Sequence, residues 1–179
     1  MTSVLGHLMA LDFESQYKSW LSCPPGALFE APVREFVEEV CNINFFSVVK
    51  GLDNKPIAEN IKEQARMSKA LFIWTDCDRE GEHIGTEVRK KAKEGNQRIL
   101  VKRARFSNTE RAHVLRAARA LTDVDENQAN AVAARIELDL RIGAAFTRLQ
   151  SLQLQRMCAD LSNKLISYGT YLLQYIYYK

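Results

Sequence analysis

The spacing of apolar and polar residues predicts alternating strands and helices along much of this chain. In PIAENIKEQARMS, Ile57, Ile61 and Ala65 stand four residues apart behind a proline that suits the first turn of a helix. The apolar runs ALFIWT and ILVKRARF flank CDREGEHIGTEVRKKAKEG, which predicts a strand, a turn into a helix that ends at Gly95, and a second strand. This order, with short connections, favours an α/β fold in which helices flank a parallel sheet.

Weaker patterns lie at both sides of this region. Residues 2–13 predict a strand and a turn, and residues 23–33, which hold three of the four prolines, predict a loop or an edge strand. The helix TERAHVLRAARAL is expected to be capped by Ser107 or Asn108. A long helix rich in Ala, Leu and Arg is expected from about 128 to 156.

The composition of the chain restricts its size class, charge and compartment but does not identify a function. With 179 residues, 46% hydrophobic and 26% charged, the chain can bury one sizeable core and form one domain or slightly more. A net charge of +3 permits a nucleic-acid partner without arguing for one. No signal peptide or membrane-spanning apolar run is found, so a soluble intracellular protein is expected. The cysteines have no CxxC spacing and suggest a reducing compartment; they are Cys23, Cys41, Cys77 and Cys158.

The most distinctive stretch is WTDCDREGE, which gathers carboxylates directly behind a predicted buried strand. Asp76, Asp78 and Glu80 alternate at the carboxyl end of that strand, the edge where α/β sheets bind ligands. Their oxygens suit Mg²⁺, and Arg79 could pair with a phosphate. Gly81 would allow a sharp turn or a close approach of the backbone. The simpler interpretation is that the aspartates cap the following helix.

Several separated motifs resemble one known family. TSVLGHL, KPIAENIKEQAR, IWTDCDREGEHIG, RARFS and ARIELDLRIGAAFTRLQ, in this order, resemble the N-terminal part of a eukaryotic type IA DNA topoisomerase of the topoisomerase III kind. The DxDREGE string is similar to the metal-binding signature of the Toprim fold. The resemblance covers roughly residues 2–34 and 55–168. It implies a Toprim, Rossmann-like parallel sheet flanked by helices, followed by the start of a helical topoisomerase domain.

The resemblance also implies roles for single residues. Asp76, Asp78 and Glu80 match the Mg²⁺-binding acids, while Arg79 and Glu82 match the rest of the string and would support the site. Glu80, Arg79 and His7 are the implied catalytic groups. The implied DNA-binding residues are Ser3, His7, Arg135 and Asp139.

Each of these roles has a simpler alternative. His7 in an apolar run is more often a buried histidine with satisfied hydrogen bonds. Arg135 and Asp139 are four apart and could form an ion pair on a helix surface. Arg141, Arg148 and Arg156 could be a solvated face or a stripe that faces phosphates. Cys77, Phe72 and Trp74 are expected to be buried packing residues rather than ligands or stacking platforms.

The chain also departs from the family pattern. It begins inside the first motif, so the family's first strand and its glutamate are expected to be missing. No tyrosine stands in the family's nucleophilic context. The expected organisation is a Toprim domain over 1–121, with an atypical insertion at 38–54, and the start of a DNA-binding helical core over 122–179. That core would be truncated, with an atypical tail over 170–179.

The resemblance therefore predicts a nuclear enzyme that acts on single-stranded DNA by Mg²⁺-assisted cleavage through a 5′-phosphotyrosine, strand passage and religation. The partners it implies are a RecQ-type helicase and an OB-fold accessory protein. Activity of this chain alone is not expected. Two alternatives stay open: a module that binds Mg²⁺ or single-stranded DNA without catalysis, and another Toprim enzyme, either a primase or a nuclease.

Overall fold

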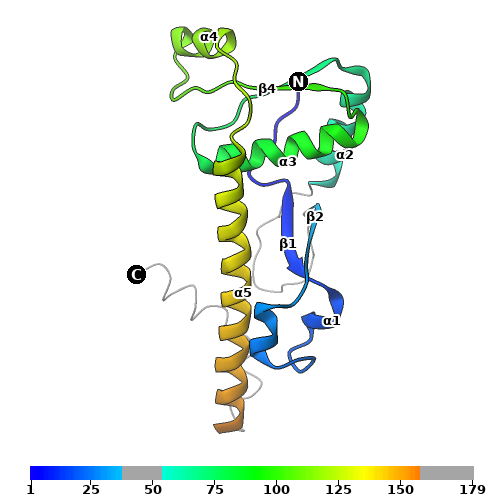
Figure 1. Cartoon of the computed structure of the whole chain (residues 1–179), viewed down its shortest axis with the longest axis vertical. Coiled ribbons are helices and arrows are strands. Elements are labelled where there is room, and N and C mark those ends of the chain that lie inside the picture. Colours follow the sequence, from blue (N-terminus) through cyan, green and yellow to red (C-terminus); the bar gives the residue numbers. More distant parts are fainter. Residues whose placement is uncertain (38–53, 158–179) are drawn as a thin grey trace. The chain divides into compact units, whose positions relative to one another are not determined.

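The computed structural model describes residues 1–37 and 54–157. Within these ranges the chain forms four strands, five α-helices and one short 3-10 helix (Figure 1). They follow one another as β1 (Met9–Phe13), α1 (Ser15–Lys18), the 3-10 helix (Pro25–Phe29), β2 (Val33–Val37), α2 (Lys55–Met67), β3 (Ala70–Ile73), α3 (Arg79–Gly95), β4 (Leu100–Arg103), α4 (Arg111–Arg119) and α5 (Glu126–Met157). No helix in the described ranges is long and apolar enough to cross a membrane.

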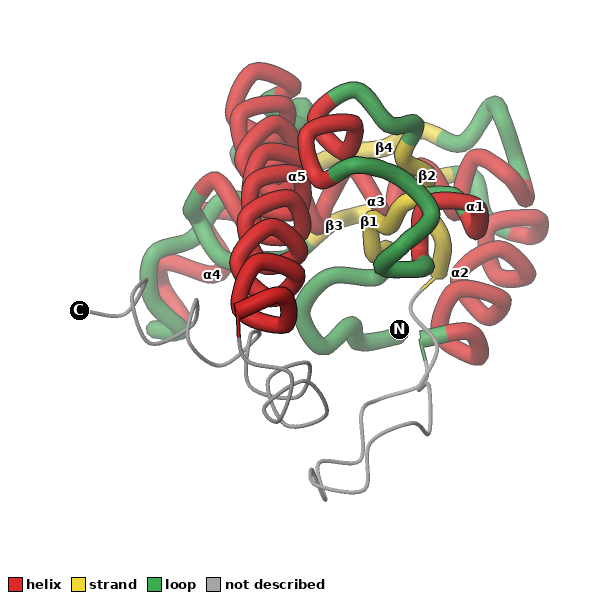
Figure 2. Tube along the Cα trace, turned by 90° about the horizontal axis from the view of Figure 1, so that it is seen from below, coloured by secondary structure: helices red, strands yellow, loops and turns green. Residues whose placement is uncertain are grey.

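The strand–helix–strand unit predicted in the middle of the chain is confirmed. β3 and β4 pair in parallel, from Ala70 opposite Leu100 to Ile73 opposite Arg103, and α3 connects them. β1 and β2 form a separate two-stranded sheet. The α/β class, the helix behind Pro56, the end of α3 at Gly95 and the long C-terminal helix all agree with the sequence pattern. Figure 2 shows α5 as one uninterrupted helix.

The chain divides into two compact units. The first comprises residues 1–10 and 35–134, and the second comprises residues 11–34 and 135–179. The expected boundary between residues 121 and 122 stays a prediction. The expected insertion at 38–54 lies outside the described residues except for Asn54, and the tail at 170–179 lies outside them entirely.

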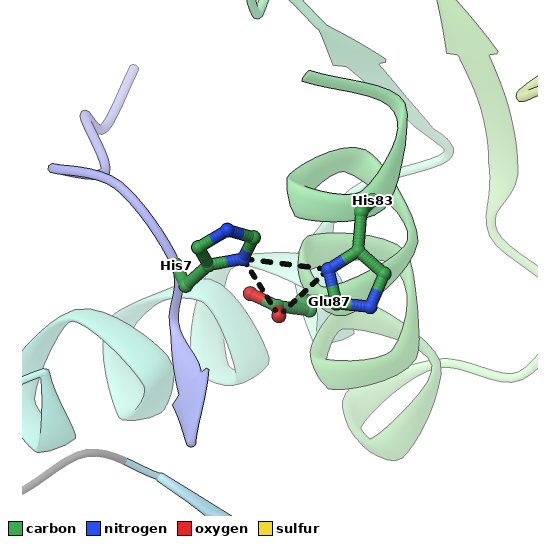
Figure 3. Close-up of side chains that lie close together, drawn as sticks. All are labelled: His7, His83 and Glu87. Atoms are coloured by element: carbon green, nitrogen blue, oxygen red, sulfur yellow. Dashed lines mark hydrogen bonds and ion pairs between the residues drawn. The ribbon is translucent and has the colours of Figure 1, made fainter. Parts of the chain in front are cut away.

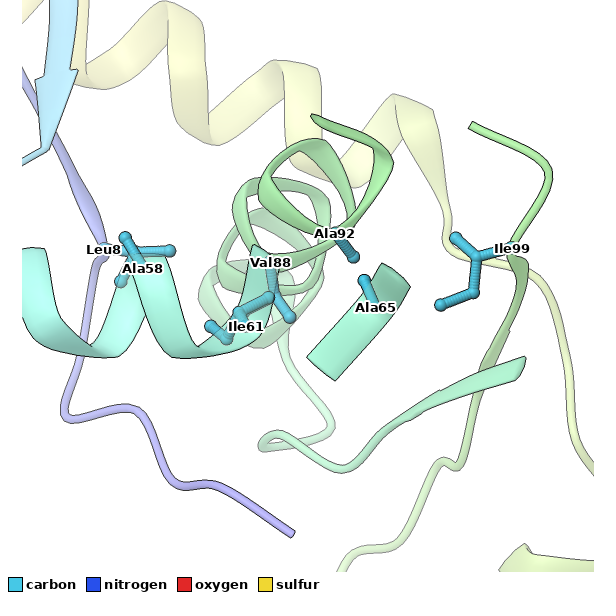
Figure 4. Close-up of a cluster of buried hydrophobic side chains, with 7 residues drawn as sticks. All are labelled: Leu8, Ala58, Ile61, Ala65, Val88, Ala92 and Ile99. Carbon is cyan, nitrogen blue, oxygen red and sulfur yellow. The ribbon is translucent and has the colours of Figure 1, made fainter. Parts of the chain in front are cut away.

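The core of the first unit is built where α2 packs on α3. Its buried side chains come from α2, α3 and the segments before β1 and β4 (Figure 4): Leu8, Ala58, Ile61, Ala65, Val88, Ala92 and Ile99. Full burial of a side chain such as Ile61 stabilises the fold by about 1.5–3 kcal/mol. The two helices come very close at Gly95, where an added Cβ would lie 2.1 Å from the carbonyl oxygen of Lys62. This packing fixes α3, which carries much of the candidate site.

The strand and the turn expected in residues 2–13 are both present: the chain turns at Gly6 and β1 begins at Met9. The expected cap of the next helix is wrong. Neither Ser107 nor Asn108 caps α4: the N-cap is Glu110, without a side-chain bond, and Asn108 Oδ1 instead accepts the Glu110 N–H at 3.2 Å. Residues 23–33 are loop as expected, and Val33 begins β2 of the two-stranded sheet; the loop also contains a 3-10 helix that starts at Pro25, since proline suits a first helical turn.

Candidate metal and DNA site

The acidic cluster lies on the turn that joins β3 to α3. Asp78 is the N-cap of α3, and its Oδ1 accepts the backbone N–H of Gly81 at 2.7 Å. The hydroxyl of Thr75 donates to the carbonyl of Gly81 at 2.7 Å from the other side of the turn. The capping interpretation is therefore correct for Asp78, as expected for an aspartate at this position. One oxygen of Asp78 caps the helix, which leaves its second oxygen for another ligand.

Gly81 allows this turn to close. A Cβ at Gly81 would lie 2.0 Å from the backbone carbonyl oxygen of Asp76, far inside van der Waals contact. The sequence predicted a close approach here, and this prediction is confirmed. The turn thus depends on a residue without a side chain at its centre.

A buried arginine holds the other end of the turn. Arg103, at the end of β4, is fully buried, and its guanidinium donates to the carbonyls of Thr75 at 2.9 Å and Asp76 at 2.6 Å. Two donors on one planar group fix the backbone that carries the first acid. The position of Asp76 is therefore set from a neighbouring strand and not only by its own turn.

Glu82 compensates the charge of that arginine. Glu82 is 2% exposed, and its Oε1 lies 3.3 Å from Arg103 Nε and 3.0 Å from Arg105 Nη2. Its second oxygen accepts the backbone N–H of Asp125 at 3.0 Å. A buried ion pair costs desolvation that only good geometry and further hydrogen bonds offset, and this pair has both. Glu82 thus pairs with the arginine that holds the turn, and its role in supporting the site stays a prediction.

The residues proposed to bind metal share this turn but do not converge on one point. Asp76, Asp78 and Arg79 are exposed, and Glu80 is half-exposed. Among the described residues, one set of three His, Cys, Asp or Glu side chains has ligand atoms within 4.8 Å of one another, and it does not contain these acids. Asp78 is turned to the cap of α3 and Glu80 is turned to His7, so their carboxylates face different partners.

His7 connects the N-terminal segment to α3 through two carboxylates. Its Nε2 lies 3.1 Å from Glu80 Oε2, and its Nδ1 lies 3.2 Å from Glu87 Oε1 (Figure 3). The hydrogen bond with Glu87 raises the pKa of His7 above its usual value, although partial burial opposes this. The simpler interpretation of His7 as a core histidine is wrong, because its ring is half-buried among charged partners.

His83 completes this group from the first turns of α3. Its Nδ1 lies 3.3 Å from His7 Nδ1 and 3.3 Å from Glu87 Oε1. Burial lowers the pKa of His83 below its usual value, since the charged ring loses water. Sequence reasoning missed both His83 and Glu87. Their spacing of four on one helix face could have drawn attention to them, whereas nothing in RARFS marks Arg103 as buried.

The residues proposed to bind DNA lie in both compact units. Ser3 is exposed in the segment before β1, in the first unit. Arg135 and Asp139 are exposed on α5, in the second unit. Exposure is what contact with a nucleic acid requires, and the roles themselves stay predictions.

Two arginines of α5 fit neither interpretation given for them. Arg141 Nη1 donates to the carbonyls of Leu28, Phe29 and Ala31 at 2.8–3.1 Å and pairs with Glu137. Arg148 is 6% exposed, and it donates to the carbonyl of Tyr17 at 2.7 Å. Neither arginine forms a solvated face or a stripe that faces phosphates. Both donate hydrogen bonds to backbone carbonyls of the segment around the 3-10 helix. Arg156, by contrast, is exposed.

Three side chains near the site that were expected to be buried are exposed: Cys77, Phe72 and Trp74. Cys77 is exposed, not buried, because it lies on the outer side of the β3–α3 turn. Phe72 is 52% exposed and Trp74 is 42% exposed, so neither is a core residue. Leu71 and Ile73 pack on the inner side of β3, whereas Phe72 points to the opposite face and is left uncovered. Trp74 instead contacts Phe106, with ring centroids 5.8 Å apart.

Comparison with known proteins agrees with this geometry. The Toprim domain family matches residues 1–109, which include the β3–α3 turn, its acids and Arg103. This chain belongs to the Toprim domain family. Toprim domains bind divalent metal ions, so the predicted requirement for a metal is confirmed at that level.

Similar proteins indicate which type of Toprim domain this chain contains. The chain is 48% identical to DNA topoisomerase 3 of Schizosaccharomyces pombe over 169 residues, 94% of this chain and 25% of the relative. It is 46% identical to human DNA topoisomerase 3-alpha over 95% of this chain and 16% of the relative. With DNA topoisomerase 3 of Saccharomyces cerevisiae it shares 43% identity over 95% of this chain and 23% of the relative. The resemblance to topoisomerase III is confirmed, and this Toprim chain spans at most a quarter of these relatives' length.

Proposed function

We propose that this chain is the metal-binding Toprim region of a type IA topoisomerase, in which Asp76, Asp78 and Glu80 hold Mg²⁺ beside the backbone of single-stranded DNA. The observation that carries the proposal is the β3–α3 turn, whose exposed carboxylates stand on backbone fixed by Gly81 and Arg103. All of these donors are oxygens, the ligand type that Mg²⁺ prefers, and one or two carboxylates suffice for it. The donor set therefore fits this ion.

Bound there, the metal ion would neutralise charge on a phosphate. The chain's own groups account for the rest of the proposed binding. Arg79 is exposed at the first position of α3, where its guanidinium could bind two phosphate oxygens and where the helix N-terminus favours an anion. His7 would hold Glu80 in place through its Nε2–H and present the adjoining backbone, with Ser3, to the DNA. Glu82 would keep the turn rigid from beneath.

Strand cleavage, passage and religation are proposed for the full-length enzyme of this type. The names of the relatives support that assignment, as does the coverage of nearly all of this chain. Within this chain we assign metal binding and contact with one DNA strand, the latter through Ser3, His7, Arg135 and Asp139. We further propose that this enzyme acts in the nucleus. Its proposed partners are a RecQ-type helicase and an OB-fold accessory protein.

The decisive experiment compares Mg²⁺ binding by the unaltered chain and by Asp76→Asn/Asp78→Asn, measured by calorimetry. The variant removes two negative charges and should weaken binding by at least about tenfold, the loss that even supporting residues of metal sites produce. Asp123→Asn is the matched control, since Asp123 is an exposed aspartate of the same unit that pairs with Lys102. Equal affinity in the double variant and the control, with both folded, would refute the assignment.

A further inference from the structure

We propose that His7, His83 and Glu87 form a second metal site, built for a zinc-class divalent ion and separate from the carboxylates of the β3–α3 turn. Figure 3 shows the three side chains pointing at one another, His7 from the N-terminal segment and the other two from α3. This inference does not rest on the proposed function, because none of its three ligands is one of the proposed Mg²⁺ ligands.

The spacing of the three ligand atoms matches a tetrahedral ion. His7 Nδ1, His83 Nδ1 and Glu87 Oε1 are separated by 3.2, 3.3 and 3.3 Å, almost an equilateral triangle. Four ligands at zinc's usual bond lengths stand about 3.3–3.4 Å apart along each edge of a tetrahedron. Octahedral Mg²⁺ would need edges of about 2.9 Å. Two imidazole nitrogens and one carboxylate also suit zinc better than magnesium.

Hydrogen bonds cannot fill all three edges of this triangle at once. Protons on both ring nitrogens could serve the two edges that end at Glu87 Oε1, but then two N–H groups face each other across 3.3 Å. A proton that bridges the two rings leaves the accepting nitrogen, of either His7 or His83, with its lone pair facing Glu87 Oε1. At most two of the three edges can hold a proton, whereas one cation at the centre satisfies all three.

The surroundings orient two of the three ligands, His7 and Glu87, as metal sites require. Glu80 lies 3.1 Å from His7 Nε2, and a proton held there leaves the lone pair of Nδ1 for the ion. The backbone N–H groups of Leu8 and Met9 donate to Glu87 Oε2 at 2.7 and 3.3 Å, so Oε1 is the oxygen left for the ion. The carbonyl of His7 accepts from Asn54 Nδ2 at 2.9 Å, which holds the segment that carries the ring.

An ion can reach this group from solvent. A surface hollow of about 280 Å³ adjoins the triangle, and two of the proposed ligands, His83 and Glu87, line it. Its other lining residues are Glu35, Thr86, Arg89, Lys90 and Lys93. Water from this hollow would supply the fourth ligand, the arrangement typical of zinc sites with three protein ligands. Binding would tie the N-terminal segment to α3.

The test titrates the full chain with Zn²⁺ in excess Mg²⁺ and records the absorption spectrum of the Co²⁺-loaded chain. We expect one Zn²⁺ per chain and the intense visible bands of tetrahedral cobalt, without a thiolate charge-transfer band. His83→Asn should weaken Zn²⁺ binding by at least about tenfold. His113→Asn, which alters a histidine of α4, should leave it unchanged.

Three results would overturn the proposal: equal Zn²⁺ affinity in His83→Asn and the unaltered chain, a weak octahedral cobalt spectrum, or a cobalt–thiolate band that assigns the ion to cysteine. The cobalt spectrum decides by itself if His83→Asn fails to fold. Asp76→Asn/Asp78→Asn should keep Zn²⁺ binding while losing Mg²⁺ binding, and His83→Asn should do the reverse. Failure of this site and failure of the proposed function are thus distinguishable.

Discussion

The surroundings of two neighbouring histidines shift their pKa values in opposite directions. His7 lies between Glu80 and Glu87, and the hydrogen bond with Glu87 raises its pKa above 6.5. Burial lowers the pKa of His83 below 6.5. We expect NMR titration of the metal-free chain to show His7 losing its proton at higher pH than His83. Glu87→Gln should lower the pKa of His7, because it removes the charge and the main acceptor.

The same shift makes the contribution of His7 to stability depend on pH. Because the folded pKa is raised, the charged ring stabilises the fold fully below the unfolded value of 6.5. This contribution is lost as pH rises through the raised folded pKa. Urea unfolding of the unaltered chain and His7→Gln should therefore differ most at low pH. His113→Gln is the control, and a His7 pKa at or below that of His83 would contradict the assignment.

At the scale of elements, the β3–α3 turn depends on one glycine. In Gly81→Ala the new Cβ would lie 2.0 Å from the Asp76 carbonyl, so the turn must open. We expect a loss of about 1–3 kcal/mol in the free energy of unfolding, the usual cost of overpacking. Mg²⁺ affinity should also fall, because Asp76 moves with its carbonyl. Denaturant unfolding and calorimetry on the same protein measure both effects.

A glycine-to-alanine substitution in α5 serves as the control for Gly81→Ala. Gly143 lies inside α5, and an added Cβ there meets nothing within 4 Å. Gly143→Ala should therefore stabilise the chain by up to about 1 kcal/mol, the difference in helix propensity. If both variants behaved alike, the close approach at Gly81 would not be a determinant of the turn.

The elements also show what the sequence could predict and what it could not. Periodicity and turn residues located α2, β3, α3, β4 and α5, because these signals are local. Local signals do not say which neighbours cover a strand. The apolar pattern therefore predicts Phe72 and Trp74 to be buried, although both are exposed. The acidic residues of the site are neighbours in the sequence, so the sequence alone identifies them. Arg103, which fixes their backbone, is recognisable only once β4 lies beside β3.

At the scale of the molecule, each compact unit has its own buried cluster. The first unit has the α2–α3 core, and the second gathers Phe13, Leu28, Ala31 and Ala145. In the second unit, arginines of α5 add polar anchors to the apolar cluster: Arg141 binds three carbonyls and Arg148 binds the carbonyl of Tyr17. These arginines are therefore expected to matter for folding and not for DNA.

Arg148→Met tests that distinction, because methionine keeps the apolar stem and removes the donors. The carbonyl of Tyr17 loses its partner, so the free energy of unfolding should fall by about 1–3 kcal/mol. Hydrogen exchange should quicken at amides of the second unit, while amides of α2 and α3 keep their protection. Arg156→Met, at an exposed arginine of the same helix, should leave stability unchanged. The opposite pattern, weaker single-strand binding by Arg148→Met at unchanged stability, would return Arg148 to the DNA-facing surface.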